Sequence, residues 1–120
     1  MLRIAVPTEG KGGLESRVSD HFGRCETYTL LDEGGNVIEV IENTSRHMGG
    51  SGLPPELIKK HSVDVLLCKG IGHKAISMFE QLGIDVYVCQ AETVGDIFNL
   101  WKNKQLGKAG PGDACKSERE

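Results

Sequence analysis

Residues 63–89 read VDVLLCKGIGHKAISMFEQLGIDVYVC and contain the pattern that decides the fold. VDVLLC is a short, mostly apolar run, typical of a strand buried on both faces. The next segment places apolar residues at helical spacing, and Gly83 stands where that helix would end. IDVYVC is a second apolar strand. A strand, a helix and a strand in this order predict a parallel pair joined by a right-handed crossover.

The chain before this unit predicts three more strands and a helix. LRIAVP (2–7) alternates apolar residues and ends at a proline, and TYTLLD (27–32) and VIEVIEN (37–43) flank a DEGGN turn, which predicts an antiparallel hairpin. Residues 8–25 form a long, glycine-rich polar stretch without helical periodicity, and we expect a loop there. LPPELIKKH (53–61) is typical of a helix start, because prolines suit the first turn.

After residue 89, Thr93 can cap a last helix with Val94, Ile97, Phe98 and Trp101 on its inner face. The element order β-β-β-α-β-α-β-α predicts an α/β domain with a ribonuclease H-like three-layer fold. Short connections favour a mixed five-stranded sheet of order 3-2-1-4-5 with only strand 2 antiparallel, and three helices. We expect one domain over residues 1–106 and a flexible polar tail over 107–120.

Composition excludes several classes of function. The 120 residues include 38% hydrophobic and 26% charged residues, which is typical of one soluble globular domain. A net charge of −3 with scattered basic residues argues against nucleic-acid binding. No apolar run approaches the roughly 20 residues that span a bilayer, and the start lacks a signal-peptide pattern, so we expect a cytoplasmic protein. The four cysteines are expected to be thiols rather than disulfides.

The predicted topology gathers the chemically active side chains at one edge of the sheet. The carboxyl ends of strands 1, 3, 4 and 5 share this edge, where ligands bind in open α/β sheets. The loops that open there carry His21, Arg24, Cys25, Arg46, His47, Met48, Cys68 and Cys89. We therefore expect a binding site at this edge.

Thiolates and imidazoles are ligands that suit metal clusters. His21, Cys25 and Cys68 are accordingly the predicted metal ligands. Further cofactor contacts are predicted for Arg24, His47 and the backbone amides around Gly70 and Gly72, which lead into a helix N-terminus. Few protein ligands would suit loose binding of a preassembled cluster, as a carrier requires.

Structural alternatives remain open for most of these residues. Cys68 and Cys89 can simply fill the ends of buried strands, since a free thiol behaves as a small hydrophobe. His47 can belong to a polar linker, and the GIG segment can serve only to turn a strand into a helix. Cys25 is undecided. In the HFG segment, Phe22 can anchor the loop while Gly23 permits a bend.

Several segments in the same order resemble the dinitrogenase iron–molybdenum cofactor biosynthesis family. They are SDHFGRC (19–25), the strand Y-x-L-x-D, VIEVIEN, VDVLLCKGIGHKA, and LGIDVYV followed by TVGDIF, and the resemblance covers residues 2–101. It implies a ribonuclease H-like fold and the binding and delivery of iron–sulfur or iron–molybdenum cofactor precursors without catalysis. In some members the histidine of the HFG motif is a cofactor ligand, which corresponds to His21.

Three hypotheses of function follow. The leading one is a non-catalytic carrier for an iron–sulfur or iron–molybdenum-type cluster, a monomer or weak homo-oligomer that works with cluster-assembly and recipient proteins. The alternative is a binding module for a small anion or a protein partner without metal. A third is a thiol-dependent enzyme with Cys25 as nucleophile and His21 nearby.

Overall fold

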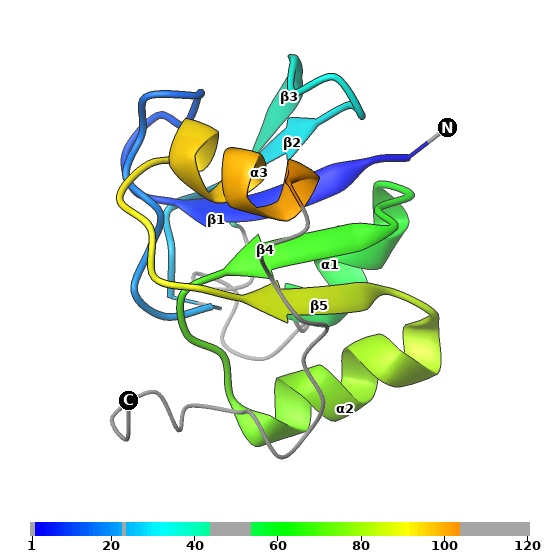
Figure 1. Ribbon diagram of the computed structural model, residues 1–120. Coiled ribbons are helices and arrows are strands. Elements are labelled where there is room, and N and C mark those ends of the chain that lie inside the picture. The colour runs from blue at the N-terminus through cyan, green and yellow to red at the C-terminus, as the bar shows by residue number, and fades with distance from the viewer. Residues whose placement is uncertain (1, 23, 44–53, 104–120) are drawn as a thin grey trace.

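The computed structural model describes residues 2–22, 24–43 and 54–103 (Figure 1). Its strands are β1 (Ile4–Thr8), β2 (Thr27–Leu31), β3 (Val37–Glu42), β4 (Val65–Cys68) and β5 (Asp85–Val88). Its helices are α1 (Pro54–Lys60), α2 (His73–Leu82) and α3 (Val94–Lys102). The element order is the one that the sequence predicts.

The strands form one mixed sheet in the order β3-β2-β1-β4-β5. β2 is antiparallel to both β1 and β3, whereas β1, β4 and β5 are parallel. This confirms the predicted order and the predicted direction of strand 2. The carboxyl ends of β1, β4 and β5 therefore point the same way, and the loops that follow them gather at one side of the molecule (Figure 1).

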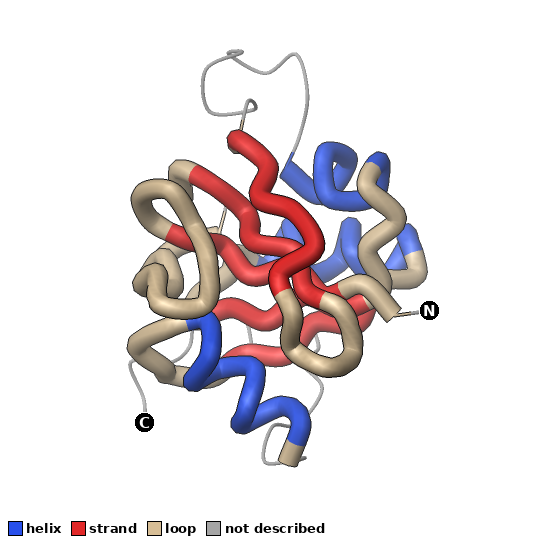
Figure 2. Tube along the Cα trace, turned by 90° about the horizontal axis from the view of Figure 1, so that it is seen from above, coloured by secondary structure: helices blue, strands red, loops and turns tan. Residues whose placement is uncertain are grey.

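Helices cover both faces of the sheet, which makes three layers (Figure 2). On one face α1 and α2 contribute Ile58, Ile76 and Phe79 to a core with inward residues of all five strands. On the other face α3 contributes Val94, Ile97 and Phe98. Neighbouring residues of β4 alternate between these two cores, because successive side chains of a strand point to opposite faces.

The central strand β1 includes Pro7, although the sequence predicts that the strand ends there. Pro7 pairs with Tyr28 of β2, and the strand continues to Thr8. The Pro7 carbonyl accepts a hydrogen bond from the Ser19 amide, so the backbone N and C=O of Pro7 point away from β2. The pairing of β1 with β4 covers only Ile4 and Ala5. The missing N–H of Pro7 therefore removes no hydrogen bond between these two strands.

Two helix ends confirm the local predictions. Gly83 ends α2 with φ 80°, and its amide and that of Ile84 donate to the last carbonyls of the helix. Thr93 caps α3, since its hydroxyl accepts a hydrogen bond from the Asp96 amide at 3.2 Å.

The β2–β3 turn is held by one carboxylate. Asp32 Oδ1 accepts hydrogen bonds from the Gly34 and Asn36 amides, each at 2.9 Å. Gly35 has φ 87° and packs so closely on Phe98 that an added Cβ would lie 2.7 Å from the ring. The hairpin is thus fixed both by its own turn and by contact with α3.

Some expectations fall outside the described residues. The predicted tail over 107–120, the loop with Arg46, His47 and Met48, and Cys115 all belong to these segments. Among the helices that the structure describes, none is both long and apolar enough to cross a membrane.

The Asp32 turn gives a pH prediction. Hydrogen bonds from Asn36 and Gly34 lower the pKa of Asp32 below its usual value of about 3.9. A lowered folded pKa means that the carboxylate stabilises the hairpin fully above the usual value, and that this contribution is lost as pH falls through the folded pKa. The NMR chemical shifts of the Gly34 and Asn36 amides, followed as the pH is lowered, should change with a midpoint below pH 3.9. A midpoint at or above that value would contradict the assignment.

Candidate functional site

The long loop after β1 is folded tightly onto the carboxyl edge of the sheet. Its backbone exchanges hydrogen bonds with α3, because the Ser16 and Leu14 carbonyls accept from the Val94 and Gly95 amides at 3.1 and 3.0 Å. The Val18 amide donates to Glu92 O at 2.9 Å. The first amides of α3 are therefore already hydrogen-bonded within the fold.

Phe22 is partly buried and anchors the loop by packing against the core beneath α2, as the sequence predicts. Its ring centroid lies 5.2 Å from that of Phe79 and 5.7 Å from that of Tyr28. Its amide donates to the Gly70 carbonyl at 2.9 Å. An aromatic ring packed against two others, together with a backbone hydrogen bond, fixes the turn that precedes it. Gly23 lies outside the described residues.

His21 and Arg24 are exposed next to this anchor. The Ser19 hydroxyl bonds with the carbonyl and the amide of His21 at 3.3 and 3.4 Å, and the Arg24 amide donates to His21 O at 3.2 Å. A compact turn therefore presents an imidazole and a guanidinium to the outside.

The predicted cysteine ligands have a different environment. Cys25 and Cys68 are 1% and 0% exposed and belong to the core under α1 and α2. The Asn43 side-chain amide donates to Cys25 O at 3.0 Å and lies 3.8 Å from its Sγ, and the Cys68 thiol lies 3.9 Å from Tyr87 O. Both thiols contribute to packing, which is the alternative that the sequence left open for Cys68.

Cys89 is half-buried just after β5. Its thiol donates to Gln90 O at 3.7 Å, and burial raises its pKa. A raised pKa favours the neutral thiol in the metal-free protein. Within residues 2–22, 24–43 and 54–103, no group of three or more histidine, cysteine or acidic side chains could hold a metal ion. His21, Cys25 and Cys68 thus do not converge as a ligand set.

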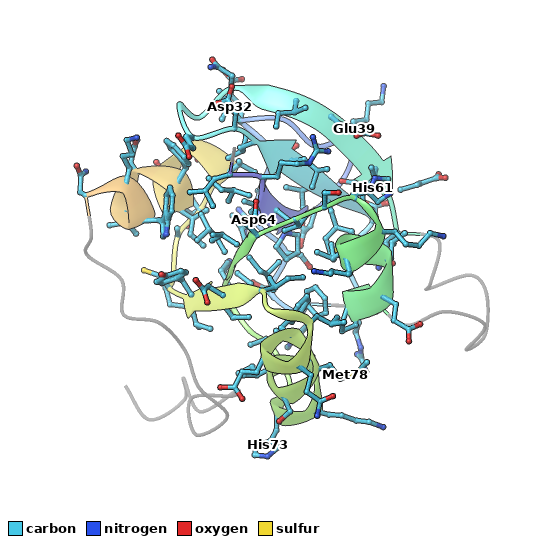
Figure 3. All side chains as sticks on the ribbon, turned by 90° about the vertical axis from the view of Figure 1, so that its right-hand side faces the viewer. Asp32, Glu39, His61, Asp64, His73 and Met78 are labelled. Atoms are coloured by element: carbon cyan, nitrogen blue, oxygen red, sulfur yellow. The ribbon has the colours of Figure 1, made fainter. Side chains whose placement is uncertain are left out.

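The two glycines of the GIG segment have different roles. An added Cβ at Gly70 would lie 2.6 Å from the Asp20 carbonyl oxygen. Because glycine has no side chain, the loop after β1 can cover the end of β4. Gly72 faces open space and is the N-cap of α2, without a side-chain cap. His73 and Lys74 of the first turn are exposed, and Figure 3 places His73 at the outer end of α2, well apart from His61.

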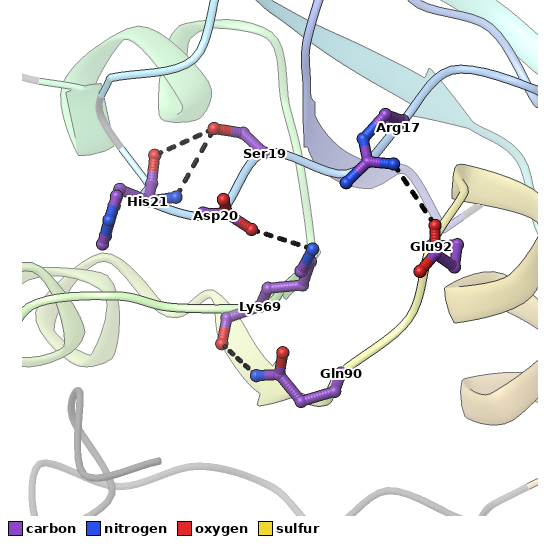
Figure 4. A network of polar contacts seen from close by, with 7 residues as sticks. All are labelled: Arg17, Ser19, Asp20, His21, Lys69, Gln90 and Glu92. Carbon is purple, nitrogen blue, oxygen red and sulfur yellow. Dashed lines mark hydrogen bonds and ion pairs between the residues drawn. The ribbon is translucent and has the colours of Figure 1, made fainter. Parts of the chain in front are cut away.

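Polar side chains join three loops across the edge (Figure 4). Lys69 Nζ lies 2.9 Å from Asp20 Oδ1, and the Gln90 side chain donates to Lys69 O at 3.2 Å. Arg17 and Glu92 form a more exposed pair at 3.3 Å. The hydrogen bond and charge of Lys69 lower the pKa of Asp20. Sequence reasoning missed the Asp20–Lys69 pair, although opposite charges on two loops at one edge were a usable signal.

A shallow hollow of about 340 Å³ lies beside α3 and is lined by Gln90, Ala91, Glu92, Asp96, Asn99, Leu100 and Asn103. None of the predicted site residues lines it. The turn with His21 and Arg24 therefore projects from the edge and is not part of this hollow.

Residues 2–104 match the profile of the family described as dinitrogenase iron–molybdenum cofactor. The chain belongs to this family. It is 36% identical over 113 residues to the uncharacterized protein MJ0580 of Methanocaldococcus jannaschii, covering 90% of this chain and 92% of that one. The apo form of the orange protein from Desulfovibrio gigas has a TM-score of 0.80 at 27% identity, with 91% and 93% of the two chains covered. The Thermotoga protein TM1290 has a TM-score of 0.75 at 32% identity, with 90% and 93% covered.

The close approach at Gly70 gives a second prediction. Gly70→Ala should lower the free energy of unfolding by about 1–3 kcal/mol, because the new methyl group overlaps backbone. It should also speed hydrogen exchange of the Phe22 amide. Gly72→Ser adds a larger side chain in open space and supplies a better cap, so stability should change by less than about 0.5 kcal/mol. Equal effects of the two changes, measured by denaturant unfolding, would contradict the proposed packing.

Proposed function

We propose that this protein is a non-catalytic carrier that binds an iron–sulfur or iron–molybdenum-type cluster at the carboxyl edge of the sheet. The cluster is cargo, received from an assembly protein and passed to a recipient. The observation that carries the proposal is the exposed His21 on a turn anchored by Phe22. Membership of the family supports the link to cofactor assembly, and the apo form of the related orange protein implies that this relative has a bound form.

The chemistry of the donors favours a preassembled cluster. The accessible donor at the turn is one imidazole, since Cys25 and Cys68 are buried. One imidazole supplies too few ligands to build a cluster on the protein, but it can occupy one position on a cluster that has formed elsewhere, on an assembly protein or in a solution of iron and sulfide. A single protein ligand also permits release, which a carrier needs.

The charges around the turn suit an anionic cargo. Arg24 is exposed beside His21, and the start of α2 presents exposed His73 and Lys74 with no side-chain cap. Cations and helix-start amides stabilise negative charge, and the sulfides of such clusters accept hydrogen bonds from backbone amides. Arg24 and the amides near Gly70 and Gly72 are therefore proposed to offset the charge of the cluster.

Anaerobic incubation with ferrous iron and sulfide, with and without molybdate, tests the proposal. The wild-type protein should develop cluster absorption that stays with it through desalting. His21→Ala should weaken retention by at least about tenfold, because even groups that only orient a ligand cost 10–100-fold when removed. His61→Ala is the matched control, since His61 lies between α1 and the amino end of β4, at the opposite edge of the sheet. No absorption with the wild type, or equal retention by His21→Ala, would contradict the carrier function.

The cysteines give a separate prediction. Cys25→Ala and Cys68→Ala should each lower the free energy of unfolding by about 1–2 kcal/mol, because each leaves a small cavity in the core. Both variants should still retain the cluster. Loss of the cluster in either variant, measured under conditions where it remains folded, would instead make that cysteine a ligand and require the core to open.

A further inference from the structure

The turn that carries His21 is attached to the sheet on both sides of the histidine. Before it, the Ser19 amide donates to Pro7 O at 2.9 Å at the end of β1. After it, the Phe22 amide donates to Gly70 O at 2.9 Å just beyond β4. Among the described residues, no hydrogen bond or ion pair reaches the His21 imidazole itself. Its direction therefore depends on the backbone of the turn.

Asp20, between these attachments, is held by Lys69. The two charged atoms are 2.9 Å apart, and the lysine side chain is only 13% exposed while that of Asp20 is 65% exposed. A packed lysine has lost most of its freedom before it pairs, so less entropy opposes this contact than opposes an ordinary surface pair. The Gln90 side chain donates to Lys69 O at 3.2 Å and fixes the backbone from which the lysine extends.

The Asp20–Lys69 ion pair and the close approach at Gly70 both hold Asp20 against the loop after β4. The Asp20 carbonyl oxygen lies where a Cβ of Gly70 would be, so the backbone of Asp20 rests directly on the loop after β4. The ion pair pulls the Asp20 side chain toward the same loop (Figure 4). Loss of the pair would leave the residue before His21 held by backbone contacts alone.

We infer that Asp20 and Lys69 are positioning residues, whose ion pair holds the turn so that the His21 imidazole is directed at the cargo. This inference rests on the proposed carrier function and deepens it. The pair acts through His21 and does not itself contact the cluster. The lysine charge is compensated by Asp20, which leaves Arg24 as the exposed cation of the turn.

The test compares two ion pairs that join the same long loop to its neighbours. Asp20→Asn and Lys69→Met break the pair beside His21, and Lys69→Arg keeps the charge. Arg17→Met is the matched control, because it breaks the exposed pair with Glu92 at 3.3 Å, away from the histidine. Each variant is loaded anaerobically with ferrous iron and sulfide, and the rate of iron loss to an iron(II) chelator is measured.

Asp20→Asn and Lys69→Met should release iron at least about tenfold faster than the wild type, as is typical when a group that orients a metal ligand is removed. Lys69→Arg should restore slow release, and Arg17→Met should stay within about twofold of the wild type. Hydrogen exchange of the Phe22 amide and the NMR shift of the His21 ring should change in the first two variants and not in Arg17→Met. Release within twofold of the wild type in Asp20→Asn and Lys69→Met would overturn the inference.

The two proposals can fail separately. If the wild type binds no cluster, the carrier function is wrong, and the inference is then decided by the metal-free protein. Faster hydrogen exchange of the Phe22 amide in both Asp20→Asn and Lys69→Met, with unchanged exchange in Arg17→Met, supports positioning, because it reports how firmly the turn is held on the sheet. Unchanged exchange in the first two variants overturns the inference.

Discussion

The central strand β1 is the constraint on which the rest of the structure depends. It is buried on both faces, with Ile4, Ala5 and Val6 at 0% exposure, and it pairs with β2 on one side and β4 on the other. The backbone N–H and C=O groups of a strand in this position need hydrogen-bond partners on both edges. β1 therefore joins the β2–β3 hairpin to the parallel strands β4 and β5. The carboxyl ends of β1 and β4 then lie side by side, and the loops that leave them have to share one space.

The proposed site is a consequence of that shared space. The loop after β1 packs Phe22 against the core and covers Gly70, and the Asp20–Lys69 ion pair joins this loop to the one after β4. Packing of the Phe22 ring on Phe79 and Tyr28 anchors the turn, and we propose that the polar contacts set its direction. His21 is thereby an exposed group on a rigid support. The proposed carrier function requires such a group, because a ligand could then bind and leave without unfolding of the loop.

Most of the fold could be predicted because its signals are local. The apolar runs before and after α2, the left-handed Gly83 and the capping Thr93 each specify an element within a few residues. The end of β1 was predicted too early at Pro7, because the cost of proline in a strand depends on whether a partner needs its N–H. The loop over residues 9–26 showed no helical or strand periodicity, and several of its hydrogen bonds join residues about 50 to 80 positions away in the chain.

The sequence by itself determined the order of the elements, the topology of the sheet, the anchoring of Phe22 and the placement of His21 at the carboxyl edge. These follow from periodicity, from turn residues and from the right-handed crossover rule. Only the tertiary structure decided that Cys25 and Cys68 point into the core, that Gly70 accommodates the Asp20 backbone, and that Asp20 pairs with Lys69. Each of these depends on the depth at which one loop packs on another, and no local pattern of residues encodes that depth.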